Sequence, residues 1–357
     1  MKNAIVIGAH YGDEGKGQTV AALAATGDFA WVVRFNGGHQ VSHTARKGDI
    51  NHTFSNFGAG TLEGIPTYWS QFCTVHPTGF MNEVHDLKIK DVRPIIYIDP
   101  NCPITTPYDI VANQQNAKNG HGTVGVGFGA TIEREVEGCS FLAKDLILGI
   151  NHITAKIFEV GQHYGFPENL PESIDSFTLN CCFTTNHAKV QAAPITSNQG
   201  VIFEGAQGLH LDQDFGVFPH VTRSNTTTKN AITLITKLKR EKLDNEVIYV
   251  TRPYVTRHGN GSLLREGAFT PPKNCDEANV SSVWQGDLRY APIDLTEMER
   301  GISYDIAMGN FPAKRRIAVT CLHHVDDYIT ISNGWKLEVI SKGSLESLLN
   351  KAILKNF

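Results

Sequence analysis

The sequence predicts an α/β fold, with residues 1–357 forming a single large domain around a mainly parallel central β-sheet that has helices on both faces and glycine-rich ligand loops. Two observations carry this prediction. Short runs of apolar, β-branched residues recur along the chain, and each ends in a glycine-rich or polar loop, as buried parallel strands do. No low-complexity linker divides the chain, and no repeat with a period of about 20 to 50 residues recurs.

The expected elements follow one another along the chain. Residues 4–8 form an apolar run that ends at glycine, and the alanine-rich residues 19–25 follow, so the chain opens as strand, loop and helix. A helix with a basic outer face is expected at residues 232–239. Residues 161–197 show no clear period and receive no element. Further strands are expected at residues 30–35, 94–98, 200–203, 246–250 and 317–320.

Composition excludes several classes of protein. With 32 basic and 36 acidic residues the net charge is −4, so nucleic acid is not an expected partner. The 7 cysteines form no CxxC pair, and their odd number favours reduced thiols in a cytoplasm over disulfides or a zinc site. No apolar signal region or apolar run of about 18 residues appears, so neither secretion nor a membrane partner is expected.

The first glycine-rich loop, GDEGKGQ at residues 12–18, has the composition of an anion site. Backbone amides at a helix N-terminus attract phosphate oxygens, and Lys16 adds a positive charge. The Walker pattern fails at His10 and Gly17, so another residue must hold a metal. Asp13 could bind Mg²⁺, act as a base toward a second substrate, or do both. Alternatively, Asp13 and Glu14 only cap the following helix.

Three further loops add chemistry. NGGHQVSHT carries His39 and His43, which could donate a proton during phosphoryl transfer or form a structural or metal pair. NGHGTVGVGFGAT, residues 119–131, could wrap a phosphate with its amides. FEGAQGLHLD supplies Gln207, and the following GVFPHVTRSNTT supplies the hydroxyls of Thr222, Ser224 and Thr226. Several separate anion loops predict two phosphorylated ligands.

Taken together, these motifs resemble those of the adenylosuccinate synthetase family. The motifs occur in the same order as in the family. This chain has GDEGKG, then GGHQVSHT where the family has GGHNAGHT, and GTVGVG where the family has GTTGRGIG. EGAQG follows, then GVFPHVTRSNTT where the family has GTYPYVTSSNTT, and VTRHGNG where the family has a TRVGAGP-like stretch. The resemblance covers most of residues 1–265 and continues weakly through VISKG. It implies a ligase in which the 6-oxygen of a purine nucleotide is phosphorylated by a nucleoside triphosphate and the phosphate is displaced by the amine of L-aspartate.

The resemblance also implies roles for individual residues. Asp13 would remove the purine N1 proton, Lys16 and His43 would stabilise developing charge, and Gln207 would orient the 6-oxygen. Asp13 and the backbone carbonyl of Ser42 would hold Mg²⁺. The triphosphate would bind at Gly12, Glu14, Gly15, Lys16, Gly17, Ser341 and Gly343. The other substrates would bind at Asp13, Asn36, Gln40, Thr123, Val124, Gln207, Thr222, Arg257 and Arg289.

Departures from the family motifs bear on the substrates. The family reads guanine of GTP with TKLD, and here Cys321 and His323 replace the lysine and the aspartate, which favours ATP. In the arginine-rich loop only Arg289 remains. With the short chain, these features resemble the phage branch that uses dGMP, ATP and L-aspartate to make 2-amino-deoxyadenylosuccinate for diaminopurine DNA, in the host cytoplasm if the chain is phage-encoded. Many members of that branch have serine where Asp13 stands.

Two alternatives stay open, and one subunit contact is expected. The chain could be an adenylosuccinate synthetase that uses IMP and GTP, or a silent nucleotide-binding protein, against which the retained Asp13, Lys16, His43 and Gln207 argue. The resemblance implies a homodimer, in which Arg134 either reaches the neighbouring nucleotide site or makes a salt bridge on its helix. The residues expected near the substrates are His258, Asn260, Trp284 and Gln285, although core packing explains Trp284 equally well.

Overall fold

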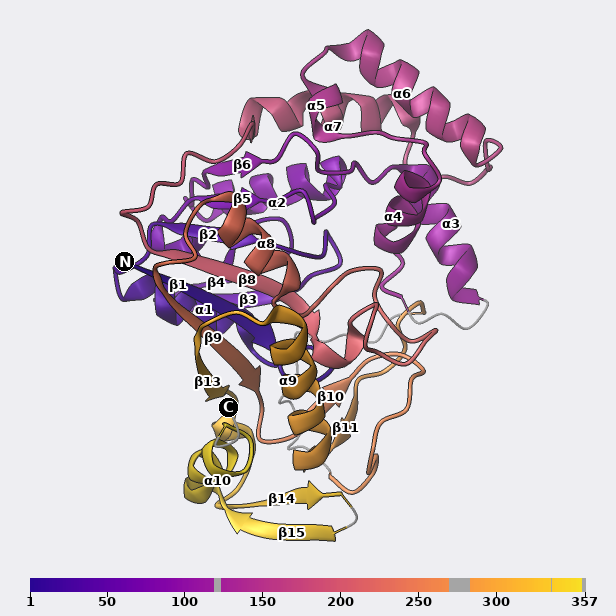
Figure 1. Ribbon diagram of the computed structural model, residues 1–357. Helices are drawn as coiled ribbons and strands as arrows, with labels where there is room; N and C mark the ends of the chain where they lie inside the picture. Colours follow the sequence, from indigo (N-terminus) through magenta and orange to yellow (C-terminus); the bar gives the residue numbers. More distant parts are fainter. Residues whose placement is uncertain (119–122, 270–282, 335, 355–357) are drawn as a thin grey trace.

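The computed structural model describes residues 1–118, 123–269, 283–334 and 336–354, and its centre is an eight-stranded sheet in the order β13-β9-β1-β8-β2-β5-β6-β7 (Figure 1). Every pairing in this sheet is parallel. The strands are β1 (Lys2–Gly8), β2 (Trp31–Arg34), β5 (Thr67–Trp69), β6 (Ile96–Ile98), β7 (Lys189–Val190), β8 (Val201–Gly208), β9 (Asp244–Thr251) and β13 (Lys314–Val319).

Smaller sheets and helices surround this centre. The remaining strands are β3 (His43–Lys47) paired with β4 (Ile50–Phe54), β10 (Val255–Arg257) paired with β11 (Arg289–Ala291), and a sheet of β12 (Ile293–Asp294), β14 (Tyr328–Asn333) and β15 (Lys336–Ser341). The α-helices are α1 (Lys16–Ala25), α2 (Pro77–Ile89), α3 (Pro107–Lys118), α4 (Phe128–Val136), α5 (Ala143–Leu146), α6 (Ile150–His163), α7 (Ile174–His187), α8 (Lys229–Lys237), α9 (Leu295–Gly309) and α10 (Leu345–Ala352). Short 3-10 helices are η1 (Ala59–Glu63), η2 (Leu209–Leu211), η3 (Leu322–His324) and η4 (Lys342–Ser344).

Alternation along β1 builds two cores, one on each face of the sheet. Ala4 and Val6 pack into a core with residues of α1, α2, α6 and α7. Ile5 and Ile7 point to the opposite face and pack with residues of α8, α9 and α10. A strand that is buried on both faces must be apolar throughout, which explains the continuous hydrophobic run. The predicted α/β fold, with helices on both faces of a mainly parallel sheet, is confirmed.

Most elements expected from sequence lie within a few residues of their predicted positions. The helix expected at residues 19–25 begins three residues earlier, at Lys16, so the lysine of the glycine loop belongs to the first turn of α1. The unassigned residues 161–197 include the end of α6, all of α7, and β7. In Figure 1, α5, α6 and α7 lie at one end of the molecule, and β14, β15 and α10 lie at the other.

The strand order brings the ligand loops together. β1, β8 and β2 are adjacent in the sheet, although β8 follows β2 by more than 160 residues in sequence. Because all three strands are parallel, the loops that follow them emerge at the same edge. This carboxyl edge is where ligands bind in open α/β sheets.

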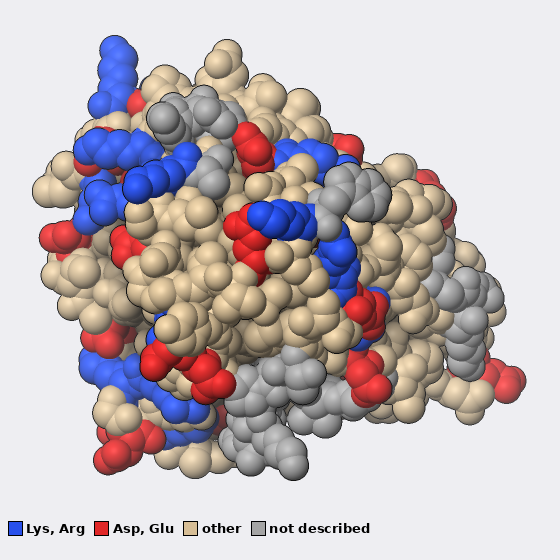
Figure 2. Space-filling view, turned by 90° about the horizontal axis from the view of Figure 1, so that it is seen from below, with Lys and Arg blue, Asp and Glu red and all other residues tan. Residues whose placement is uncertain are grey.

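Two surface properties bear on partners. Among the described residues, no helix is both long enough and apolar enough to cross a membrane. The face in Figure 2 shows Lys and Arg side chains interspersed with Asp and Glu, in keeping with the near balance of charges in the sequence.

Candidate functional site

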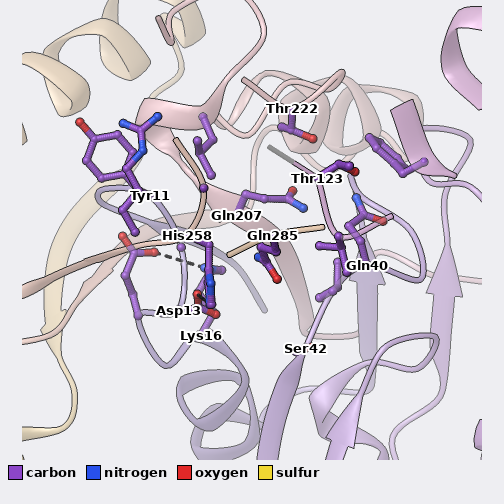
Figure 3. Close-up of a pocket in the computed structure, with 18 of the residues that line it drawn as sticks. Tyr11, Asp13, Lys16, Gln40, Ser42, Thr123, Gln207, Thr222, His258 and Gln285 are labelled. Atoms are coloured by element: carbon purple, nitrogen blue, oxygen red, sulfur yellow. Dashed lines mark hydrogen bonds and ion pairs between the residues drawn. The ribbon is translucent and has the colours of Figure 1, made fainter. Parts of the chain in front are cut away.

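A cavity of about 820 Å³ lies at the carboxyl edge of the sheet, where the loops after β1, β2 and β8 meet (Figure 3). Its wall includes the whole segment 12–18, residues 40–44, and Gln207. Much of the remaining wall is formed by residues 218–223, residues 257–261, and residues 321, 323 and 324. The size and polarity of the wall suit a site for more than one small polar ligand.

The loop after β1 separates its two acids. Glu14 is buried beside Lys16, with 3.2 Å between Glu14 Oε2 and Lys16 Nζ, and its Oε1 accepts a hydrogen bond from the backbone N–H of His10. Burial raises the pKa of Glu14, while the Lys16 ammonium acts in the opposite direction. Asp13 instead has φ 56° and remains 25% exposed in the cavity wall. Asp13 therefore faces the cavity, where a ligand can reach it, and Glu14 pairs with Lys16.

Neither acid caps the helix. The N-cap of α1 is Gly15, in the left-handed conformation with φ 86°, and no side chain makes a capping hydrogen bond. Glycine is needed here because a Cβ would lie 2.7 Å from Oγ1 of Thr320. The alternative in which Asp13 and Glu14 only cap the helix is wrong. The N-terminus of α1 therefore carries no side-chain cap, which is compatible with the expected anion site.

His43 is supported by a buried carboxylate. At the start of β3, its Nδ1 lies 2.7 Å from Oε1 of Glu204, and Glu204 also accepts a hydrogen bond from the backbone N–H of Ala59. Burial would raise the pKa of Glu204, but His43 and Arg34 hold it below its ordinary value overall. An ionised Glu204 keeps the proton on Nδ1 of His43 and leaves Nε2 for other partners.

His39 does not share the site of His43. Its Nδ1 contacts Asn56 at 3.1 Å, its ring packs against His76, and it is absent from the cavity wall. The interpretation of His39 and His43 as a metal pair fails among the described residues, which contain no group of three His, Cys, Asp or Glu side chains able to hold a metal. His43 alone keeps a candidate role in proton transfer.

Two amide side chains of the cavity wall have buried atoms without a protein hydrogen-bond partner. Gln207 lies near the end of β8 with φ 57°, and its buried Oε1 has no hydrogen-bond partner. Neither polar atom of the Gln40 amide has a partner either. Asn36 differs, because its amide bonds both the N–H and the carbonyl of Ala206 and it does not line the cavity. Asn36 therefore fixes the last part of β8, while Gln40 and the Oε1 of Gln207 are available to a ligand.

Two hydroxyls lie across the cavity from the β1 loop (Figure 3). Thr123 and Thr222 line the wall together with Val124, and Thr123 Oγ1 donates to Oδ1 of Asn113 at 2.9 Å. Residues 119–122 of the same glycine loop lie outside the described part of the chain. The hydroxyl of Thr226 instead donates to the carbonyl of Gly208, outside the cavity wall.

The segment after β10 contributes one arginine and one histidine. The Arg257 guanidinium lies 4.1 Å from the ring centroid of Tyr11 and donates to the carbonyl of Ser262. His258 Nε2 lies 3.3 Å from Oδ2 of Asp13. Asn260 and Gln285 also line the cavity, whereas Trp284 packs against Gly125, where a Cβ would meet its ring at 2.8 Å. Three of the four residues expected near the substrates are therefore in the wall.

Several predicted binding residues lie elsewhere. Arg289 is held by Glu266 at 2.7 Å and by the carbonyls of Gly259 and Gly261, behind the wall. Ser341 and Gly343 belong to β15 and η4, and neither lines the cavity. The structure thus gives these three residues no direct contact with the cavity. The short motif VISKG was too weak a signal to place the last two.

Arg134 is not available to a second subunit. The side chain is fully buried in α4, where Nε donates to Oδ1 of Asp109 at 2.9 Å and Nη2 donates to the carbonyl of Ile104. The prediction that Arg134 could reach a neighbouring nucleotide site is wrong, and the alternative of a salt bridge on its own helix holds, with 2.9 Å between Arg134 Nη1 and Glu135 Oε1. A charge fully removed from water is retained only where it is paired in this way.

The loop after β13 places the substituted family motif beside the glycine loop. Thr320 Oγ1 donates to the carbonyl of Glu14 at 2.6 Å, and the following Cys321 and His323 line the cavity. Position 321 has φ 53°, which turns the chain into η3. The residues that replace the lysine and aspartate of TKLD therefore lie next to the candidate phosphate loop.

The oxygen donors present fit Mg²⁺. Asp13 offers an exposed carboxylate and Ser42 lies in the same wall. Mg²⁺ prefers one or two protein carboxylates together with phosphate oxygens and water, so a site with few protein ligands suits it.

Sequence reasoning did not single out Glu204 as the partner of His43. The residue stands inside EGAQG, and its position at the end of a buried strand next to β2 was the available signal. Asn113 of α3 and Glu133 of α4 in the wall were also missed, because these helices have no recognisable motif, and Arg223 was not singled out within GVFPHVTRSNTT.

Comparisons with known proteins agree with this geometry. The family model for adenylosuccinate synthetase matches residues 5–276. The adenylosuccinate synthetase of Ruthia magnifica subsp. Calyptogena magnifica is 30% identical over 286 residues, covering 74% of this chain and 64% of the relative. That of Neisseria meningitidis serogroup C is also 30% identical over 286 residues, covering 74% of this chain and 65% of the relative. The chain thus spans slightly less than two thirds of the length of these relatives.

Two solved structures share the fold. Adenylosuccinate synthetase from Plasmodium falciparum superposes with a TM-score of 0.71 at 20% identity, covering 95% of this chain and 83% of that one. Succinoaminodeoxyadenylate synthetase (PurZ) of cyanophage S-2L, solved with dGMP and with dATP as an energy donor, gives a TM-score of 0.62 at 12% identity, covering 98% and 99% of the two chains. Since the family model spans most of the chain, including every loop of the cavity up to residue 261, this protein belongs to the adenylosuccinate synthetase family.

Proposed function

We propose that this protein is a ligase that joins L-aspartate to C6 of a purine nucleoside monophosphate at the expense of a nucleoside triphosphate. The observation that supports it most directly is the convergence of Asp13, Lys16 and His43 on one cavity whose opposite wall carries Thr123 and Thr222. Asp13, Lys16 and His43 suit the place where the 6-oxygen of the purine meets the γ-phosphate of the triphosphate. The hydroxyls of Thr123 and Thr222 suit the phosphate of the monophosphate.

In the proposed mechanism, Asp13 accepts the N1 proton of the purine, and the electron pair moves to the 6-oxygen. That oxygen attacks the γ-phosphorus, the bond to the β–γ bridging oxygen breaks, and the nucleoside diphosphate leaves. Lys16 and the amides of α1 stabilise the phosphate charge, and His43, held by Glu204, donates a hydrogen bond from Nε2 when protonated. The amide of Gln207 orients the 6-oxygen. Asp13 and the Ser42 carbonyl would hold Mg²⁺, which would supply charge neutralisation when bound.

The second step replaces the phosphate. The α-amine of L-aspartate attacks C6, the C6–O bond breaks, and inorganic phosphate leaves with its electron pair. The amine loses two protons, one before attack and one after it, and the purine recovers a neutral ring. Phosphorylation is needed because an unmodified 6-oxo group is a poor leaving group.

We propose dGMP and ATP as the preferred nucleotides. Cys321 and His323 stand beside the glycine loop where the family motif has a lysine and a guanine-reading aspartate. Neither replacement offers a carboxylate to N1–H and the 2-amino group of guanine, so the free energy that selects GTP over ATP is lost. The product would be 2-amino-deoxyadenylosuccinate, a precursor of 2-aminoadenine nucleotides.

One observation favours a second candidate, an adenylosuccinate synthetase that uses IMP and GTP. Asp13 is retained and faces the cavity, whereas many members of the phage branch have serine there. We also propose a homodimer that acts in the cytoplasm, in analogy with the family.

The test is phosphate release by the purified protein with L-aspartate and Mg²⁺, crossing dGMP, GMP and IMP against ATP and GTP. The proposal expects the highest kcat/KM for dGMP with ATP, and no release when L-aspartate is omitted. Preference for IMP with GTP would establish the second candidate instead. Nucleotide binding without turnover in any combination would leave only a nucleotide-binding protein.

A further inference from the structure

His258 lies next to the candidate base and has one unused nitrogen. Its Nε2 is 3.3 Å from Oδ2 of Asp13, a contact drawn as a dashed line in Figure 3. Its side chain is only 10% exposed, and Nδ1 is buried without a hydrogen-bond partner. The corresponding position of the TRVGAGP-like family motif is a valine, which has no polar atom. The histidine is therefore a departure located beside Asp13.

The contact with Asp13 decides which nitrogen carries the proton. A neutral imidazole has one N–H and one lone pair, and a lone pair directed at a carboxylate oxygen would be repelled. In the neutral imidazole Nε2 therefore carries the hydrogen, and Nδ1 is an acceptor. An acceptor that is buried without a donor costs free energy, which a ligand N–H can relieve.

The other carboxylates of the described wall are already engaged. Glu14 pairs with Lys16, and Glu133 pairs with Arg223 at 2.6 Å. Asp13 is thus the carboxylate available to N1–H of a 6-oxopurine, as the proposed function requires. The 2-amino group is attached to the carbon next to N1, so a group beside Asp13 is placed to meet it. In hypoxanthine this carbon carries only a hydrogen.

We propose that Nδ1 of His258 accepts a hydrogen bond from the 2-amino group of a guanine nucleotide and thereby selects dGMP over its hypoxanthine counterpart. This inference rests on the proposed function, since it assigns the purine ring the orientation in which N1 faces Asp13. His258 and Asp13 then contact adjacent positions of the same base edge, the 2-amino group and N1–H. A valine at position 258, as in the family motif, offers no side-chain acceptor to the 2-amino group.

The test compares dGMP with dIMP, which differ only in the 2-amino group, in the wild type and in His258→Val. The assays contain ATP, L-aspartate and Mg²⁺. Loss of the contact with Asp13 lowers turnover of both substrates, so the readout is the ratio of their kcat/KM values. We expect the ratio of dGMP to dIMP to fall by at least about ten-fold in His258→Val.

His258→Asn serves as the matched control, because its side-chain carbonyl can occupy the place of Nδ1 and should retain most of the preference for dGMP. It also covers the case in which His258→Val folds poorly. A preference for dGMP that is equal in wild type and His258→Val would overturn this inference alone. A wild type that prefers dIMP would overturn the proposed function together with it. An equal loss for both nucleotides with a raised KM for L-aspartate would assign His258 to the amino acid and also overturn the inference.

Discussion

Nδ1 of His43 lies 2.7 Å from Oε1 of Glu204, which is fully buried in the middle of β8. Glu204→Gln removes the charge that orients the imidazole and stabilises its protonated form. We expect kcat for phosphate release to fall on the order of 100-fold, with nucleotide dissociation constants little changed. Steady-state kinetics and calorimetric binding check this.

Glu83→Gln is the matched control for that variant. Glu83 is also a buried glutamate beside a histidine, His52 at 3.4 Å, but neither residue lines the cavity. Its loss should lower stability without slowing the folded enzyme. Equal kcat in Glu204→Gln and the wild type would contradict the positioning role of Glu204.

Asp13→Ala tests the base. The carboxylate is partly exposed in the cavity, and the helix does not depend on it for a cap. Phosphate release should become undetectable, because the N1 proton has no acceptor, while binding of the monophosphate remains measurable by calorimetry. Turnover close to that of the wild type would remove Asp13 from the mechanism.

Cys321→Lys combined with His323→Asp tests the choice of triphosphate. The double variant restores TKLD beside the glycine loop and supplies a carboxylate for guanine N1–H and its 2-amino group. The ratio of kcat/KM for GTP to that for ATP should rise by at least about ten-fold. Cys321→Lys alone, which lacks the carboxylate, is the control and should change the ratio much less. If the two variants behave alike, His323 does not face the base.

His76 makes stability depend on pH. Its Nδ1 accepts a hydrogen bond from the backbone N–H of Gly79 at the N-cap of α2, and burial together with the nearby His39 lowers its pKa to about 3. The folded state therefore keeps His76 neutral while the unfolded chain binds a proton below about pH 6.5. Stability is lost as the pH falls through that value, by about 2 kcal/mol between about pH 7 and pH 5.

His76→Asn preserves the cap without a titrating group, since asparagine is a favourable N-cap residue. Urea unfolding at the two pH values should show a smaller loss of stability for the variant, by about 2 kcal/mol. Other buried histidines, such as His10, are common to both proteins and cancel in the comparison. Identical losses would show that His76 is not responsible.

Local patterns predicted the sheet and its loops well, because buried parallel strands have a distinctive composition. β1 and β8 were found from uninterrupted apolar runs, and Asp13, Lys16, His43 and Gln207 from the glycine-rich segments that follow such runs. In each of these segments the strand that positions the backbone and the side chain that lines the cavity lie close together in sequence, so one local pattern predicts both.

Contacts between distant segments could not be predicted in the same way. Glu204 and His43 form a pair although they are 161 positions apart in sequence. No local pattern around either residue indicates that the other is its partner. For Arg134 a contact with a second subunit was considered from its sequence position. The side chain is instead buried between α3 and α4, where it pairs with Asp109. α7 has no regular apolar stripe, so its helical period was not visible before its packing against α2 was known.

The position of β1 in the sheet has a consequence for synthesis of the protein. Lys2–Gly8 is made first, but both of its neighbours, β8 and β9, begin only at Val201 and Asp244. A ribosome must therefore translate more than half of the chain before the central strand can pair with either of them. Until then an apolar segment stays without its native partners, so we expect slow folding and a need for protection from aggregation while the chain emerges.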